Sequence, residues 1–553
     1  MTVQFSSPLY IKIDGQMADD ILMGNVIQLL VDQHCQLPDL FQIRLSDPGF
    51  HYIDSGYFEL GTAVEIGSFS ADEEPVPLIF GEVTSLEPEF TAGTAPFLVV
   101  RGFDRSHRLY RELKSRAFVN VKDSDLAQQI ANEAGLQTNI QATRLVYEHI
   151  LQHNESDLAL LQARAARIGY LCFVSQQTLH FHPPGQGSGQ EVGLTWGENN
   201  LEVRPRLSAA DQVDELVVRG WDPEKQVPLV GQAQGPELLP AIEMAGAADE
   251  QRHSFGSNRA IVVAEQVHSQ AEADILARAA LTARSGSFVE LSGQVFRRPD
   301  VQAGCTIALA GIGERFSGRY LVSQASHIYD GASGLQTEFQ VQGLRRGLLA
   351  DSLANGSPAE QAGVMIAIVT NNNDPNQSGR VKLKYPWLTD NAESFWARVL
   401  APGDVALTPA VGEEVLVSFE NGDLNRPVVL GKLPRPAAGS GGGDDSQNPA
   451  DSRRFVSRAG HLIELDDGQR KRIAIASQAG HRLELDDSGG QITIQTKNGL
   501  SFTLNDNGRA VTINSNGVIK LAASSNLELS ANGNVSIRAG AQLSLQGAMV
   551  NIN

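Results

Sequence analysis

Residues 511–552 repeat one short pattern: Val511-Thr512-Ile513, Ile519-Lys520-Leu521, Leu527-Glu528-Leu529, Val535-Ser536-Ile537, Leu543-Ser544-Leu545 and Val550-Asn551-Ile552. Each triplet is apolar, polar, apolar, and successive triplets start 8, 8, 8, 8 and 7 residues apart. Alternation with a period of two is typical of a β-strand, and the intervening Gly, Asn, Ser and Ala residues are typical of turns. A strand that recurs at a fixed interval predicts a solenoid rather than a globular domain.

This octad tract cannot bury its own apolar side chains. An octad supplies one short strand and one corner, so a single-chain β-helix would need about three octads for each turn. If three identical chains wind together, their apolar residues meet on a common axis and the lateral strand edges disappear. With strands stacked about 4.8 Å apart, six octads climb roughly 29 Å. The tract therefore predicts a homotrimeric β-helix or β-prism needle, whose core we expect to contain Val511, Ile513, Ile519, Leu521, Leu527, Leu529, Val535, Ile537, Leu543 and Leu545.

A longer repeat precedes the octads. The segment Ala459-Gly460-His461-Leu462-Ile463-Glu464-Leu465-Asp466-Asp467 returns 20 residues later as Ala479-Gly480-His481-Arg482-Leu483-Glu484-Leu485-Asp486-Asp487, and more loosely after a further 19 as residues 498–506. Short alternating runs lie between the copies, so we expect hairpins that lead into the octads. The paired aspartates have two interpretations, calcium ligands or ordinary hairpin turns, and the following glycines favour turns.

Composition limits the classes of function. The 553 residues carry a formal net charge of −20, which opposes binding to nucleic acid or to anionic membranes. The three cysteines, Cys35, Cys172 and Cys305, make a poor disulfide framework, so we expect synthesis in a reducing cytoplasm. The N-terminus lacks a basic segment followed by an apolar run, and no stretch approaches about 18 apolar residues. We therefore expect neither a conventional signal peptide nor a transmembrane segment.

The remaining chain predicts a mainly β, multidomain protein. Its segments are strand-rich residues 1–103, an α+β segment at 104–200, strand-rich residues 201–350, a compact unit at 364–433, a flexible linker at 434–454 and the spike at 455–553. Three helices are expected, and in the first two apolar residues recur at helical spacing behind capping residues and before a glycine. They run from Asp123 to Gly135, from Asp157 to Gly169 and from Ala271 to Arg284.

Residues 364–433 predict an OB-type barrel. About five strands fit in this unit, at residues 364–370, 380–385, 395–400, 414–419 and 427–430. Many OB folds bind single-stranded nucleic acid through basic grooves with interleaved aromatic residues. This segment has six Lys and Arg against eight Asp and Glu, and its aromatic residues are not interleaved with basic ones. We therefore expect no nucleic-acid partner.

Three segments resemble one known family. Residues 411–431, from Val411-Gly412-Glu413-Glu414 to Val429-Leu430-Gly431, resemble the OB domain of VgrG and of phage baseplate spike proteins. Residues 147–160 with Gly169-Tyr170 look like the matching helix in the hub of that family, and residues 320–327 resemble its closing strands. Hub, OB barrel and octad needle follow one another in this order over nearly the whole chain.

The resemblance implies a structural part of a contractile injection system. In such proteins the hub contains two tube-like β-barrel modules per chain, so a trimer presents six modules to a six-fold inner tube. Residues 1–103 and 201–350 would be these modules, with a helical insert between them. The implied partners are two further copies, the inner tube protein, baseplate proteins, payload proteins and a PAAR-type cap on Val550, Asn551, Ile552 and Asn553. The particle would be extracellular or cell-anchored.

Motifs for catalysis are absent from the sequence. It contains no P-loop, no His-Glu-x-x-His and no Gly-x-Ser-x-Gly, and the 434–454 linker is too short to hold a domain. Asp374 begins a calcium-like loop, but Tyr385 stands where the bidentate acid belongs, which favours a turn. His180 and His182 lie on one side of a predicted strand without a third metal ligand nearby. We expect no enzyme activity, cofactor or metal; the alternative is a tail-associated enzyme or effector with its activity in the hub.

Overall fold

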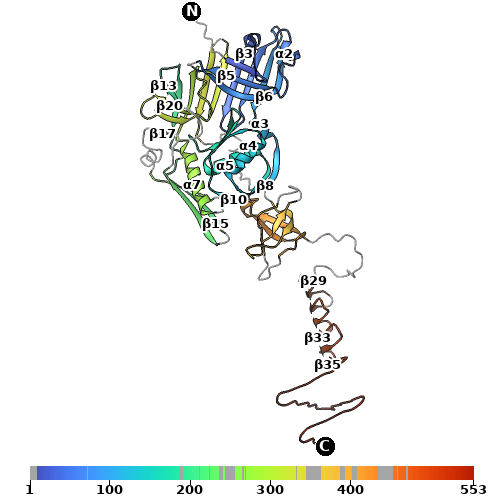
Figure 1. The fold of residues 1–553 in the computed structure, drawn as a ribbon. Helices are drawn as coiled ribbons and strands as arrows, with labels where there is room; N and C mark the ends of the chain where they lie inside the picture. Colours follow the sequence, from blue (N-terminus) through green and yellow to red (C-terminus); the bar gives the residue numbers. More distant parts are fainter. Residues whose placement is uncertain are drawn as a thin grey trace, which may run out of the picture. The chain divides into compact units, whose positions relative to one another are not determined.

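The computed structural model describes residues 9–552 apart from residues 71–72, 186–190, 211, 223–224, 236–240, 243–255, 264–266, 268, 332, 344–362, 386–392, 401–407, 434–451, 458 and 469–470. The chain divides into two compact units, residues 1–435 and 436–553 (Figure 1). It is mainly β and multidomain, as predicted. The predicted domain boundaries stay predictions, and most of the 434–454 linker lies outside the described residues.

The first unit begins with a strand-rich module. Its elements are β1 Leu9–Ile13, β2 Gln16–Met17, α1 Asp20–Asn25, β3 Val26–His34, β4 Leu40–Ser46, α2 His51–Asp54, β5 Ala63–Phe69, β6 Pro75–Glu89 and β7 Phe97–Asp104. In β4 the apolar residues Phe41, Ile43 and Leu45 alternate with polar ones, and all three are buried in one core. This alternation places one face of the sheet inward and the other outward.

An α+β segment follows. Its elements are α3 Ser106–Arg111, β8 Leu113–Lys122, α4 Asp123–Glu133, β9 Gln137–Ile140, β10 Val146–Ser156, α5 Asp157–Ile168, β11 Leu171–Ser175 and β12 Thr178–His182. The two predicted helices are confirmed: Ser156 Oγ accepts a hydrogen bond from the Ala159 N–H at 3.2 Å, and Gly169 ends α5 at φ +73°. The segment 147–160, which resembles the matching hub helix of the family, contains only the start of this helix, because residues 146–156 pair with β8 as a strand and the helix begins at Asp157.

The second strand-rich part of this unit contains β13 Val192–Thr195, β14 Glu202–Leu207, β15 Glu215–Asp222, β16 Val227–Gln234, β17 Ala241–Ile242, β18 Arg259–Val263, α7 Gln270–Ser285, β19 Val289–Phe296, β20 Thr306–Ala310, β21 Gly318–Leu321, β22 Gln324–Asp330 and β23 Gly334–Val341. The helix predicted at 271–284 is confirmed as α7. It packs on β16, where Gly231 permits the contact: a Cβ there would lie 2.1 Å from the Ala273 carbonyl oxygen.

One sheet connects the two strand-rich parts. Its order is β14-β19-β23-β22-β3-β4-β7-β6-β5-β1-β2, and the junction is the antiparallel pair β22 and β3. Separate apolar cores lie on the two halves, one around Phe41 and Ile66 and the other around Phe288 and Tyr320. The two strand-rich parts therefore share one continuous sheet, with a separate core on each half.

Residues 365–432 form a five-stranded sheet. Its elements are β24 Met365–Asn371, β25 Lys382–Lys384, β26 Arg398–Val399, β27 Glu414–Phe419, the 3₁₀ turn η2 Glu420–Gly422 and β28 Pro427–Lys432. The order is β25-β24-β27-β28-β26, around a core that includes Val381, Leu383 and Val415. The five predicted strands are confirmed, although β26 is shorter than expected.

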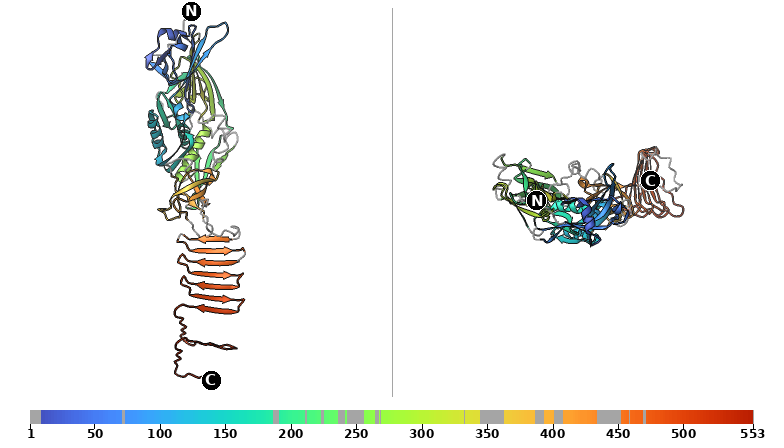
Figure 2. Two further views of the ribbon diagram at one scale, coloured as in Figure 1. Left: turned by 90° about the vertical axis from the view of Figure 1, so that its right-hand side faces the viewer. Right: turned by 90° about the horizontal axis from the view of Figure 1, so that it is seen from above.

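The described strands of the second unit form one antiparallel meander. Its strands are β29 Ser452–Val456, β30 Leu462–Asp466, β31 Arg472–Ala476, β32 Arg482–Asp486, β33 Gln491–Gln495, β34 Ser501–Asn505 and β35 Ala510–Asn514. Each strand pairs with its sequence neighbour, and Figure 2 shows them stacked one below the other. The predicted hairpins upstream of the octads are confirmed.

Candidate oligomerisation surface

One face of the meander carries two columns of apolar side chains, which we call the apolar face. Side chains alternate in direction along a strand, so the second and fourth residues of each strand share this face. The register aligns them: Ile463 lies opposite Ile475, and Leu465 lies opposite Ile473. The columns consist of Phe455, Ile463, Ile475, Leu483, Ile494, Phe502 and Ile513, and of Leu465, Ile473, Leu485, Ile492, Leu504 and Val511.

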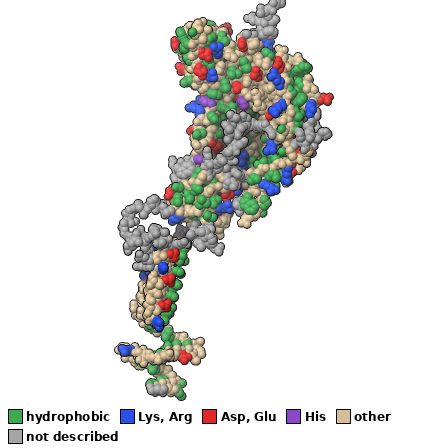
Figure 3. Space-filling view, turned by 180° about the vertical axis from the view of Figure 1, so that it is seen from behind, with side chains coloured by type: hydrophobic (Ala, Val, Ile, Leu, Met, Phe, Trp, Pro, Cys, Tyr) green, Lys and Arg blue, Asp and Glu red, His purple; other side chains and the backbone are tan. Residues whose placement is uncertain are grey.

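The apolar face is accessible to solvent in the single chain. Eight of its thirteen residues are exposed, from 39% at Ile492 to 66% at Val511, and the other five are half-buried. Figure 3 shows hydrophobic side chains gathered along one side of this unit. A contiguous exposed apolar surface of this kind marks an interaction site.

The opposite face of the meander carries an ion-pair network. Arg472 bridges two strands, because its Nη2 lies 3.0 Å from Glu464 Oε2 and its Nη1 lies 3.2 Å from Glu484 Oε1. Arg454 reaches Glu464 at 2.6 Å, and Arg482 reaches Glu484 at 3.0 Å. The sheet is therefore strongly amphipathic, with charged groups paired on one face and apolar groups accessible on the other.

The octads form only one strand within the chain. The first triplet lies in β35, whereas the described residues 515–552 contain no paired strand. The apolar side chains of the remaining five triplets are 50–84% exposed: Ile519, Leu521, Leu527, Leu529, Val535, Ile537, Leu543, Leu545, Val550 and Ile552. Of the predicted tip residues, Val550, Asn551 and Ile552 are exposed, and Asn553 lies outside the described residues. The predicted trimer core and tip stay predictions.

The sequence analysis missed most of the apolar face, because it placed the needle core only from Val511 onward. Eleven of the thirteen residues in the two columns precede Val511. The signal that identifies them is the apolar–polar alternation inside the 20-residue repeat, which has the same period of two as the octads. The candidate surface therefore begins at β29 rather than at β35.

The paired aspartates lie in hairpin turns, so that interpretation is confirmed. Asp466 Oδ1 accepts a hydrogen bond from the Gly468 N–H at 3.0 Å, and Asp486 Oδ1 accepts one from the Gly489 N–H at 2.7 Å. Among the described residues, no group of three or more His, Cys, Asp or Glu side chains could hold a metal ion.

The two other metal candidates also lie in ordinary structure. Asp374 pairs with Arg380, Oδ1 to Nη2 at 3.0 Å, and this partner lowers the pKa of Asp374 to about 2. His180 and His182 lie in β12 with ring centroids 5.6 Å apart, and the His180 ring stacks on Phe173 at 4.7 Å. Burial lowers the pKa of His180 to about 4.

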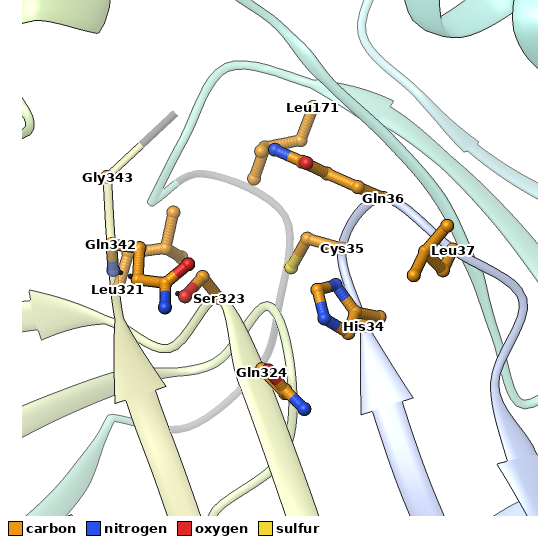
Figure 4. Close-up of a pocket in the computed structure, with 10 residues that line it drawn as sticks. All are labelled: His34, Cys35, Gln36, Leu37, Leu171, Leu321, Ser323, Gln324, Gln342 and Gly343. Atoms are coloured by element: carbon orange, nitrogen blue, oxygen red, sulfur yellow. Dashed lines mark hydrogen bonds between the residues drawn. The ribbon is translucent and has the colours of Figure 1, made fainter. Parts of the chain in front are cut away.

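A cavity of about 230 Å³ lies near the junction of β3 and β22 (Figure 4). Its lining residues are His34, Cys35, Gln36, Leu37, Leu171, Leu321, Ser323, Gln324, Gln342 and Gly343. The Cys35 thiol donates to the Val322 carbonyl oxygen at 3.6 Å, and burial raises its pKa. A buried thiol with a raised pKa is a poor nucleophile.

Two family models match the chain. The model described as the Alg8 N-terminal domain matches residues 14–330, which is more than half of the sequence. The chain belongs to this family. A second model, described as the type VI secretion system/phage-baseplate injector OB domain, matches residues 365–433. The predicted resemblance to VgrG and phage baseplate spike proteins is confirmed.

The chain is similar to several solved structures. A chain of the half-lidded PdpA–VgrG complex from Francisella is similar over 93% of this chain and 88% of that chain, with 8% identity and a TM-score of 0.50. The E. coli c3393 protein, a component of the type VI secretion system, matches over 76% and 99% with 15% identity and a TM-score of 0.46. A 43 kDa tail protein of prophage MuSo2 from Shewanella oneidensis matches over 61% and 99%, with 13% identity and a TM-score of 0.46.

The described helices include none that is both long and apolar enough to cross a membrane. Residues 365–433 match the injector OB domain, and the fold of the chain is similar to that of a chain in the half-lidded PdpA–VgrG complex.

Proposed function

We propose that three copies of this chain form a spike-hub that joins a six-fold inner tube to a three-fold needle and punctures a target envelope when a sheath contracts. The observation that carries the proposal is the apolar face of β29–β35, which is continued by the exposed triplets of the octads. The role is structural rather than enzymatic.

Burial of the apolar face favours association. Fully burying one Leu, Ile, Val or Phe side chain contributes about 1.5–3 kcal/mol. Thirteen such residues lie in the two columns. The translational and rotational freedom that the chains lose on association costs roughly 4–15 kcal/mol. Even with the partial burial already present in one chain, the face can offset that cost.

Three copies suit both parts of the needle. Three meanders with their apolar faces toward one axis make a closed triangular prism. Three octad tracts that wind together provide each short strand with neighbours from the other chains, which the described residues 515–552 lack within their own chain. Two facing meanders would cover each other but would not close the octads into a ring.

The hub supports the symmetry change. Each chain carries two cores on one continuous sheet, joined where β22 pairs with β3. Three chains would therefore present six such modules in a ring. We propose that this ring contacts the inner tube protein and that baseplate proteins surround the hub.

The proposed needle ends at the exposed residues Val550 to Ile552, where a PAAR-type protein would cover the last strands. Payload proteins are further candidate partners. We propose synthesis in a bacterial cytoplasm, followed by assembly into an extracellular or cell-anchored particle.

Light scattering on the purified full-length chain tests the proposal. We expect a mass of three times 59.5 kDa. A matched variant that ends at residue 433 retains the hub and the OB domain but lacks the meander and the octads, and we expect it to be monomeric. A variant that ends at residue 508 keeps eleven of the thirteen residues of the apolar face but loses the octads, so we expect it to trimerise more weakly than the full-length chain. A monodisperse monomer of the full-length chain would overturn the proposal.

A further inference from the structure

The 20-residue repeat places a histidine and an aspartate at opposite ends of the same strand. His461 directly precedes β30 and Asp467 directly follows it; His481 and Asp487 bracket β32 in the same way. All four side chains are exposed in the single chain. The hairpin turns of the meander lie alternately on its two sides, at the two ends of the strands. Both histidines therefore lie on one side of the sheet and both aspartates on the other.

The local hydrogen bonds define which atom each histidine presents. His461 Nδ1 accepts from the Gln478 N–H at 3.2 Å, and His481 Nδ1 accepts from the Lys497 N–H at 3.4 Å. A neutral imidazole with an accepting Nδ1 carries its proton on Nε2. The side of the sheet that carries the two histidines thus presents Nε2–H groups, which could donate hydrogen bonds to a carboxylate.

The two aspartates of each pair have different surroundings in the hairpin turn. Asp466 and Asp486 accept hydrogen bonds from turn glycines and hold their own hairpins. Asp467 and Asp487 are exposed at the ends of the strands. The second aspartate of each pair is the one placed to contact another chain.

Ring symmetry brings the histidine side of one chain against the aspartate side of another. In a closed ring of identical chains, the contact is heterologous, so the strand ends on one side of each sheet meet those on the other side of the next sheet. The chains of the ring are related by rotation about the symmetry axis without translation along it. Equivalent strands of different chains therefore lie at the same height along the axis. The end of β32 in one chain meets the start of β32 in its neighbour.

We propose that, at each corner of the prism, His461 and His481 of one chain donate hydrogen bonds to Asp467 and Asp487 of the next chain. This inference rests on the proposed trimer and specifies how its chains are aligned. The third copy of the repeat supplies a natural contrast, because Leu500 stands in place of the histidine opposite Asp506. The polar corner contacts would thus be confined to the first two repeats.

Contacts within one chain cannot mimic this arrangement. Residues 481 and 487 lie at opposite ends of one strand, about 20 Å apart at roughly 3.3 Å per residue. Neighbouring repeats are two strands apart, which is about 9.6 Å along the stack. A short link between positions 481 and 487 must therefore join two chains.

Zero-length carbodiimide cross-linking of the full-length His481→Lys variant tests the inference. We expect the new amine at position 481 to couple with Asp487, and mass spectrometry should identify that peptide pair in a covalently linked multimer. The Leu500→Lys variant is the matched control, and its amine should couple with Asp506. The wild-type chain shows which links form without a new amine.

The outcomes separate the two proposals. A trimer by light scattering with the 481–487 link supports both. A trimer in which position 481 couples mainly with Asp467, with Asp506 or with no carboxylate would overturn the corner contacts and leave the trimer standing. A monomeric chain would overturn the trimer itself.

Discussion

His149 Nδ1 lies 3.0 Å from Asn425 Oδ1, although the two residues are 276 positions apart. His149 belongs to β10 of the α+β segment, and Asn425 lies between η2 and β28. The same Asn425 oxygen accepts the Leu151 N–H at 2.8 Å, and His149 Nε2 lies 3.0 Å from the Glu393 carbonyl oxygen. One asparagine side chain therefore joins the OB domain to the hub.

We expect Asn425→Ala to weaken this junction. The change leaves the Leu151 N–H without its acceptor and removes a partner of His149, at a cost of roughly 1–3 kcal/mol. Thermal unfolding should show an earlier transition for the OB domain. Asn132→Ala, on the exposed side of α4, is the control and should change little. Equal melting of both variants would contradict this role.

Burial raises the pKa of Asp104 to about 7, well above its ordinary value of 3.8. The folded hub therefore binds more protons than the unfolded chain between about pH 4 and 7, and its stability falls as pH rises through this range. Asp104→Asn should stabilise the hub at pH 8 and weaken the pH dependence, while the neighbouring Asp39, whose pKa is also raised by burial, retains part of it. Urea unfolding at pH 5 and pH 8 measures both effects; a variant less stable at pH 8 than the parent would contradict the expectation.

Arg472→Met should destabilise the meander more than Arg454→Met. Glu464 and Asp466 are each 4% exposed, and Arg472 contacts both while its own side chain is 13% exposed. Removing it leaves buried carboxylates without their main partner, which costs roughly 3 kcal/mol. Arg454 is 58% exposed, so its loss should cost less. Melting of the two variants in parallel tests the ranking, and equal losses would argue against a central role for Arg472.

Ile537→Asp should destabilise the proposed needle by well over about 1 kcal/mol per chain, because it places carboxylates near the axis. Ser536→Asp is the matched control, since the middle residue of a triplet points to the opposite side. Trimer dissociation on dilution, followed by light scattering, compares the two. If Ser536→Asp proved the more damaging change, the assignment of inward and outward positions would be reversed.

Local sequence signals predicted the helices well. α4 and α5 begin at acidic or capping residues and end near glycines, and their buried residues recur at helical spacing. The segment before α5 carries no clear signal of its own, because its buried residues Tyr147 and Ile150 suit either a helix face or a strand. The pairing of this segment with β8 decides in favour of the strand.

Long-range pairing was beyond sequence reasoning. Nothing in β3 or β22 indicates that they are neighbours, since the pattern of a strand specifies its faces but not its partner. The apolar face could have been predicted from the sequence, because the alternation of apolar and polar residues is present in each half of the 20-residue repeat, but the prediction assigned a needle core only to the octads.

The pairing of β3 with β22 also sets an order of events during synthesis. Asp32 and Ser326, which hydrogen-bond across these strands, are 294 residues apart. At roughly 5–20 residues per second, a ribosome needs about 15–60 seconds to translate that interval. Until then β3 has an unpaired edge, and a nascent chain in this state is the one that a chaperone or a second nascent copy would meet.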